Sequence, residues 1–406
     1  MRRERIVDVL VVGAGPAGLA AAAGLAGAGA GEVEVVERER QAGGIPRHCL
    51  RGGFGRIGLS GPQYAERCVA AAVGAGAVLR TGVSVTGWAG PLTLDSTSPR
   101  GLERITARAV VLATGARERP RAARLVPGTR PAGVFTTGEL QQAADLHRQR
   151  IGTRAVVVGA EPVSFAALDT LRRAGVTVAA LVTEHPRHQA PRTRVLDARL
   201  RRGVPLLTDA TVAELLGRGR LSGVRLRHRD GRSAQVDCDT VVFTGDFVPD
   251  HELARRGGLL LDPGTRGPAV DGAFRTDERG VFAVGNVLHA AEPARVVARE
   301  GAMASAAVRR YLSDGDWPAA AVPLRVADPL AWIAPNRLTV EEPADGFTLR
   351  TTEFVARPTL VVTQDGRTLH RTGPRRPAVP NRPLRVSAGW TARVDAAGGP
   401  VRIALG

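Results

Sequence analysis

The chain has 406 residues and a formal net charge of +17. This length is enough for about two or three domains, each with a core of its own. The positive charge comes from arginine alone, because the sequence contains no lysine, and the arginines are scattered rather than clustered beside the few aromatic residues. Nucleic-acid binding is therefore not expected, and neither a Schiff base nor a P-loop lysine can come from this chain.

The cysteines and the apolar segments exclude further classes. Cys49, Cys68 and Cys238 lie far apart and form no CxxC motif, so neither a disulfide scaffold nor a metal site is expected, whereas a reducing, cytoplasmic location is. No uninterrupted apolar run is long enough for an integral membrane segment. Arg2 and Arg3 before an apolar stretch resemble a twin-arginine signal, but removing that stretch would delete the best-formed βαβ unit of the chain.

The first βαβ unit is the most informative part of the sequence. Apolar residues 7–12 predict a buried strand, which runs into the glycine-rich turn 13–18, an alanine-rich helix and a second strand, 33–36. This order is typical of a dinucleotide-binding unit. The free N–H groups and the positive dipole end of the helix suit the phosphates of such a ligand. The alternative is a core helix without a ligand.

Each glycine of this turn has a separate role. Gly13 permits the tight turn, Gly15 lets a pyrophosphate approach bare backbone, and Gly18 lets the helix and strand pack closely. Eighteen residues separate Gly18 from Glu37. This spacing places the carboxylate at the end of the second strand, where it can accept hydrogen bonds from ribose hydroxyls.

The same order of elements recurs along the chain. Strand 108–112 leads to Thr114-Gly115, strand 154–158 leads into a second turn and helix, and strand 240–243 leads to Thr244-Gly245. This recurrence indicates an internal duplication of a nucleotide-binding unit. Further strands are expected at residues 83–88, 92–96, 103–106, 176–182, 211–216, 222–228, 233–237 and 281–284. One helix is expected to start at residues 60–62 and another to cover residues 293–312. From about residue 318 the tail predicts a small all-β domain.

On these motifs the chain resembles the two-domain flavoproteins with the glutathione reductase fold, the pyridine nucleotide–disulfide oxidoreductases. Residues 13–18 with Glu37 match the FAD fingerprint, residues 111–115 the second motif and residues 281–286 the third. In the third motif, Asn286 stands where the family has an aspartate that holds the ribityl chain of the flavin.

The resemblance implies an α/β fold with two dinucleotide-binding, Rossmann-like domains of three-layer β/β/α architecture and a small all-β C-terminal domain. The FAD-binding domain would comprise residues 1–118 and 268–312, the NAD(H)-binding-like domain residues 119–267, and the β domain residues 318–406. The cofactor implied is FAD. Its expected binding residues are Gly13, Gly15, Pro16, Ala17, Gly18, Glu37, Arg38, Gly44, Ile45, Thr114, Gly115, Gly285 and Asn286.

Four further segments resemble those of the flavin subunits of heteromeric dehydrogenases or oxidases of the glycerol-3-phosphate, opine, proline or sarcosine type. They are residues 43–49, 116–120, 135–139 and 285–288. This likeness implies an FAD-dependent oxidoreductase that passes electrons between a small-molecule substrate or NAD(H) and a partner redox subunit, such as a flavin dehydrogenase or an iron–sulfur protein. A standalone NADH-dependent flavin reductase or oxidase and a non-catalytic, FAD-stabilised scaffold are the alternatives.

The chain departs from the family at the redox disulfide. Only Cys49 follows the Gly-Gly loop, so dithiol–disulfide exchange is not expected. Cys49 is either a structural or flavin-lining residue or a single redox thiol, and His48 is either a structural residue or a proton-transfer group. The helix over 293–312 would aim its N-terminus at the flavin, and His289 and Glu292 before it are either capping or catalytic groups.

The second nucleotide-binding turn is altered. Where a pyridine-nucleotide site needs Gly-x-Gly-x-x-Gly, Gly159 is followed by Glu161 and Ser164. Glu161 replaces the glycine that a pyrophosphate approaches and adds a negative charge, and both changes oppose binding. Glu184 is placed for a ribose and favours NAD over NADP; together with Gly245 it would complete the NAD(H) site if that site functions. The alternative is a vestigial or partner-facing surface.

Overall fold

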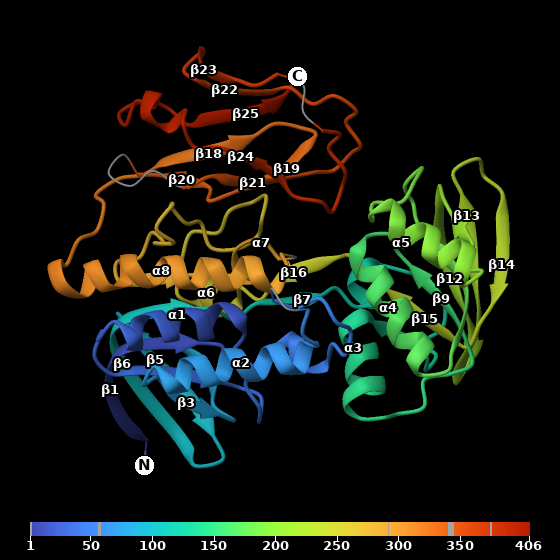
Figure 1. Ribbon diagram of the computed structural model, residues 1–406, viewed down its shortest axis with the longest axis horizontal. Coiled ribbons are helices and arrows are strands. Elements are labelled where there is room, and N and C mark those ends of the chain that lie inside the picture. Colours follow the sequence, from blue (N-terminus) through green and yellow to red (C-terminus); the bar gives the residue numbers. More distant parts are fainter. Residues whose placement is uncertain (1, 56–57, 291, 340–344, 374–375) are drawn as a thin grey trace. The chain divides into compact units, whose positions relative to one another are not determined.

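The computed structural model describes residues 2–55, 58–290, 292–339, 345–373 and 376–406 (Figure 1). The chain forms two compact units. The first comprises Met1–Arg47, Phe54–Arg117 and Val248–Gly406, and the second comprises His48–Gly53 and Glu118–Phe247. Besides the short segment His48–Gly53, the chain passes from the first unit to the second within β7 (Ala116–Glu118) and returns within β16 (Phe247–Pro249).

The first unit contains a seven-stranded sheet in the order β3-β2-β1-β6-β5-β4, with β17 beside β6. Strands β3, β2, β1, β6 and β17 pair in parallel, whereas β4, β5 and β6 pair antiparallel. The strands are β1 (Arg3–Val12), β2 (Val33–Glu37), β3 (Val78–Thr81), β4 (Ser84–Gly90), β5 (Thr93–Ser98), β6 (Gly101–Leu112) and β17 (Val281–Ala283). The separate strands predicted at 103–106 and 108–112 are thus one strand, because β6 pairs with β1 along its whole length from Glu103 to Leu112.

The helices of this unit are α1 (Pro16–Gly27), α2 (Gly61–Gly74), α6 (Glu252–Arg256), α7 (Asn286–His289) and α8 (Ala294–Asp314). Figure 1 shows α1 and α8 side by side. A Cβ atom on Gly301 would lie 2.0 Å from the carbonyl oxygen of Ala17, and one on Gly24 would lie 2.6 Å from Oγ of Ser305. Gly301 therefore lets α8 approach the backbone of α1, and Gly24 makes room for the side chain of Ser305. Because Ala17 meets Gly301 and Gly24 meets Ser305, the helices run in the same direction.

The second unit repeats the plan of the first. Its parallel sheet has the order β11-β10-β9-β15-β8, and a three-stranded antiparallel sheet, β12-β13-β14, accompanies it. The strands are β8 (Val134–Thr136), β9 (Arg154–Val158), β10 (Thr177–Val182), β11 (Leu206–Leu207), β12 (Ala210–Arg218), β13 (Arg220–His228), β14 (Ser233–Asp237) and β15 (Thr240–Phe243). The helices are α3 (Thr137–Gln141), α4 (Pro162–Arg173) and α5 (Arg192–Leu196), of which α3 and α5 were not predicted. The fold with two Rossmann-like units is confirmed, whereas the exact domain boundaries stay predictions.

The tail after residue 318 belongs to the first unit. Its described regular elements are β-strands, as predicted, apart from a single 3-10 turn at Thr391–Arg393. Two small sheets, β20-β18-β25-β22-β23 and β19-β21-β24, enclose a core that includes Phe347 and Trp390. The strands are β18 (Val322–Val326), β19 (Leu330–Ala334), β20 (Arg337–Leu338), β21 (Phe347–Thr351), β22 (Leu360–Gln364), β23 (Arg367–Arg371), β24 (Leu384–Val386) and β25 (Val401–Leu405). Asn336 ties this β domain to residue Val270, whose N–H donates to Oδ1 of Asn336 at 2.8 Å. No helix in the described part of the chain is long and apolar enough to cross a membrane.

Candidate functional site

The glycine-rich turn between β1 and α1 has one open face. Gly13 has φ +108°, and a Cβ atom there would lie 2.4 Å from the carbonyl oxygen of Ala113; a Cβ atom on Gly18 would lie 2.0 Å from the carbonyl oxygen of Gly13. At Gly15, in contrast, nothing lies within 4 Å of the Cβ position. The outer two glycines thus serve packing, and Gly15 leaves free space at the N-terminus of α1. This is the opening that a pyrophosphate requires.

Glu37 closes one side of this turn from the end of β2. Its Oε2 accepts from the N–H of Ala14 at 2.9 Å, and its Oε1 accepts from the N–H of Glu39 at 2.9 Å. Each carboxylate oxygen keeps a further lone pair. The side chain is therefore fixed beside the turn and can still accept hydrogen bonds from ribose hydroxyls. The neighbouring Arg38 is largely exposed and pairs with Asp250 at 3.3 Å.

Two further segments come to the same turn. The N–H of Gly43 donates to the carbonyl of Ala14 at 2.8 Å, and a Cβ atom on Gly44 would lie 3.0 Å from Cα of Gly15. Ile45, next in the loop, is 57% exposed. The predicted second motif follows β6, where Oγ1 of Thr114 donates to the carbonyl of Asp250 at 2.7 Å and the carbonyl of Gly115 accepts from the N–H of Asp250 at 2.8 Å.

The third motif packs on the start of α1. A Cβ atom on Gly285 would lie 2.6 Å from Cβ of Ala17. Oδ1 of Asn286 accepts from the N–H of Glu292 at 2.8 Å, and its Nδ2 donates to the carbonyl of Glu292 at 3.1 Å. The N–H of Gly285 donates to Oε2 of Glu300 at 3.2 Å. The residues predicted to bind FAD all lie in the first unit, and the three motifs meet at its glycine-rich turn.

The predicted catalytic residues lie in the second unit. Cys49 is 5% exposed and His48 is 3% exposed. Sγ of Cys49 accepts a weak hydrogen bond from Nε2 of Gln141, on α3, at 3.7 Å. Cys49, Cys68 and Cys238 all carry free thiols, and the described residues contain no group of three or more potential metal ligands.

The second nucleotide-binding turn is filled by its own side chain. Glu161 is 4% exposed, although it directly precedes α4. A Cβ atom on Gly245 would lie 2.6 Å from Cδ of Glu161, and one on Gly159 would lie 2.7 Å from Oε2 of Glu161 and 2.7 Å from Oγ of Ser164. Oε1 of Glu161 has no hydrogen-bond partner among the residues that the structure describes. The carboxylate therefore occupies the space beside Gly159 of this turn and beside Gly245, which follows β15.

Arg124, which was not predicted from the sequence, supplies positive charge to this turn. Its guanidinium donates to the carbonyls of Arg119 and Thr244, the latter at 3.2 Å. Burial lowers the pKa of Arg124, and the carboxylates of Asp246, Glu118 and Glu161 act in the opposite direction. No local motif marks Arg124, because 120 residues separate it from Thr244.

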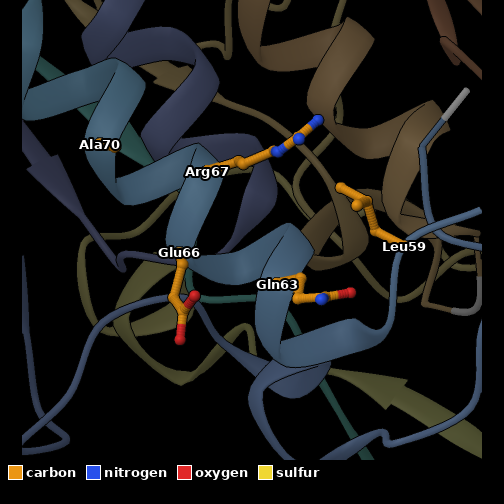
Figure 2. Close-up of a pocket in the computed structure, with 5 residues that line it drawn as sticks. All are labelled: Leu59, Gln63, Glu66, Arg67 and Ala70. Carbon is orange, nitrogen blue, oxygen red and sulfur yellow. The ribbon is translucent and has the colours of Figure 1, made fainter. Parts of the chain in front are cut away.

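A surface pocket lies elsewhere, along α2 (Figure 2). Its lining residues are Leu59, Gln63, Glu66, Arg67 and Ala70. None of them belongs to the predicted site, and Figure 2 shows the Glu66 and Arg67 side chains pointing in different directions rather than converging. This pocket is therefore not the candidate site.

Comparison with known proteins identifies the class. The chain matches the pyridine nucleotide-disulphide oxidoreductase family over residues 7–309 and belongs to that family. Its members are flavin-dependent oxidoreductases, and the chain is one of them.

Individual relatives span several activities. The chain is 27% identical over 323 residues to a ferredoxin–NADP reductase of Ignicoccus hospitalis, an alignment that covers 76% of this chain and 99% of the relative. It is 28% identical over 330 residues to one of the subunits of the opine oxidase of Rhizobium meliloti, covering 73% of this chain but only 62% of the relative. Among solved structures, thioredoxin reductase of T. acidophilum has a TM-score of 0.64 at 23% identity, over 77% of this chain and 99% of that one. This last likeness shows the shared fold.

Proposed function

We propose that the chain holds FAD noncovalently at the glycine-rich turn of the first unit and acts as the flavin subunit of a heteromeric dehydrogenase or oxidase. It would pass electrons between a small-molecule substrate or NAD(H) and a partner redox centre. The observation that carries this proposal is the contrast between the two nucleotide-binding turns. The first is open at Gly15, whereas the second is filled by Glu161.

The open turn suits the cofactor. A bound flavin supplies the capacity to accept and return electrons, and the chain supplies binding and orientation. Gly15 gives backbone access to the pyrophosphate, and Glu37 accepts from the ribose. The N-termini of α1 and α8 bring free N–H groups and positive dipole ends to an anionic ligand.

The filled turn disfavours a standalone NADH oxidoreductase. A pyrophosphate at Gly159 and Gly245 would meet the carboxylate of Glu161, so NAD(H) fits only if this side chain moves. Delivery of electrons by a partner protein avoids this obstacle. The relation to the opine oxidase of Rhizobium meliloti supports the proposal, because the relative is itself named as a subunit.

One observation favours the second candidate, a standalone NAD(P)H-dependent flavin reductase. The ferredoxin–NADP reductase of Ignicoccus hospitalis aligns over almost its whole length. Glu184 is exposed just after β10. If the turn opened, its carboxylate would face the ribose and select NADH over NADPH.

The test is to purify the chain alone and together with whatever protein co-elutes, and to record the visible spectrum before and after adding reductants. Flavin reduction that needs the co-eluting partner supports the proposal. Rapid bleaching by NADH in the isolated chain favours the standalone reductase. A flavin that stays oxidised even with partner and substrate present would favour the scaffold.

A further inference from the structure

A cluster of buried charges joins the C-terminal β domain to the segment before α8. Arg350, on β21, forms an ion pair with Oε1 of Glu292, and the two side chains are 9% and 1% exposed. The Arg350 guanidinium also lies over the ring of Trp332, on β19, at 5.6 Å. The imidazole of His289 stacks on Trp332 at 5.9 Å, and its Nε2 lies 3.0 Å from Oε1 of Glu300. These residues come from α7, α8, the segment between the two helices, and strands β19 and β21.

The cluster adjoins the glycine-rich turn. Asn286 holds the backbone of Glu292, and Glu300 accepts from the N–H of Gly285, whose Cβ position is 2.6 Å from Ala17. Because α1 and α8 run in the same direction and Gly301 meets Ala17, α8 begins about two turns ahead of α1, and its N-terminus points past the glycine-rich turn. The positive dipole end of α1 thus faces the place proposed for the pyrophosphate, and that of α8 lies beyond it.

Glu292 would oppose this arrangement if it stood alone. It lies two residues before α8 begins, so its negative charge would cancel the partial positive charge of the helix end. A buried carboxylate without a partner is also costly. Oε2 of Glu292 has no hydrogen-bond partner in the described part of the chain, and the guanidinium of Arg350 pairs with Oε1.

On the basis of the proposed FAD site, we infer that Arg350 of the C-terminal β domain is a positioning residue of the flavin site. It neutralises Glu292, so that the N-terminus of α8 presents net positive potential to the cofactor and stabilises the negative charge that reduction adds. The β domain lies beyond the residues that match the family, 7–309. It therefore contributes an electrostatic element from outside the shared fold.

The test is a charge cycle read by the midpoint potential of bound FAD. Arg350→Met, Glu292→Gln and the double variant are compared with the full wild-type chain under the same buffer conditions. Arg367→Met, a change of an exposed arginine on β23, is the matched control. Among the described residues, His289, Glu300 and Arg385 also carry ionisable groups that interact with members of this cluster.

We expect Arg350→Met to lower the potential and weaken FAD binding to the apoprotein, Glu292→Gln to raise the potential, and the double variant to return towards wild type. A purely structural role would lower thermal stability without shifting the two potentials in opposite directions. Unmoved potentials, or shifts of the same sign in both single variants, would overturn the inference while the proposed function stands. A wild-type chain that cannot be loaded with FAD would overturn both.

Discussion

The side-chain amide of Asn286 closes a ring with Glu292, accepting from its N–H at 2.8 Å and donating to its carbonyl at 3.1 Å. An amide can do both, whereas an ionised carboxylate accepts but does not donate. The asparagine that replaces the family's aspartate therefore shapes the loop that leads from β17 into α8. In the sequence this asparagine indicates only the loss of a negative charge. In the structure its amide also holds the backbone of Glu292.

Asn286→Asp should consequently destabilise the first unit. The new carboxylate would face the carbonyl of Glu292 instead of donating to it, which costs about 1–3 kcal/mol in the free energy of unfolding. Denaturant unfolding of the full chain measures this loss. Asn381→Asp, at an exposed position, serves as the control and should be nearly neutral. Equal stability of the two variants would show that the ring contributes nothing.

Features set by residues close in sequence could be predicted, whereas contacts between residues far apart in sequence could not. The glycine-rich turns, Glu37 and the start of α2 at Ser60 are set by residues close in sequence, and their positions were predicted. The Arg350–Glu292 pair spans 58 residues and Arg124 meets Thr244 across 120. No spacing rule marks such pairs. The full length of β6 was missed for the same reason, because its pairing with β1 decides where it ends.

Gly15→Glu should abolish flavin binding. The Cβ position of Gly15 is open, so a side chain can begin there without a clash at Cβ, but a carboxylate would occupy the phosphate position and repel the ligand. We expect a folded chain that is colourless, whereas wild type is yellow. Absorbance near the flavin bands, with circular dichroism as the folding control, measures this. Normal FAD occupancy would remove the assignment of this turn to the cofactor.

Cys49→Ser should retain most of the flavin-linked activity. Cys49 is buried and accepts a hydrogen bond from Gln141, and neither Cys68 nor Cys238 is spaced to exchange with it, so thiol–disulfide exchange is not part of the proposed function. Turnover with the co-purified partner, normalised to FAD content, is the measurement, and Cys68→Ser is the control. If turnover disappeared in Cys49→Ser alone while FAD stayed bound, a single-thiol mechanism would replace this one.

The stability of the first unit should depend on the protonation of His289. Burial alone would lower the pKa of His289, but the carboxylates of Glu300 and Glu292 outweigh burial and the opposing charge of Arg350, so the pKa is raised above 6.5. A raised pKa in the folded state stabilises the fold fully at pH values below the ordinary pKa, and this contribution is lost as pH rises through the folded value. Thermal unfolding midpoints from about pH 6 to pH 9 should therefore fall in wild type and fall less in His289→Gln. Parallel profiles would contradict the expectation.

Glu161→Gly should open the second nucleotide-binding turn. The change removes the carboxylate that fills the space above Gly159 and Gly245 and leaves the positive charge of Arg124 nearby to attract phosphate. Relief of the clash and of like-charge repulsion is worth on the order of 2 kcal/mol, or roughly a thirtyfold gain in NADH affinity. NADH should be preferred over NADPH, because Glu184 repels a 2′-phosphate.

The measurement is the stopped-flow rate of flavin bleaching as a function of NADH concentration. Glu161→Gln is the matched variant, since it removes the charge but keeps the volume. Slow reduction of wild type, intermediate reduction of Glu161→Gln and fast reduction of Glu161→Gly would separate the electrostatic part of the obstruction from the steric part. Fast, tightly saturating reduction of wild type would show instead that the Glu161 side chain moves aside. In that case the standalone NADH-dependent oxidoreductase would become the preferred function, because the chain would need no partner to deliver electrons to its flavin.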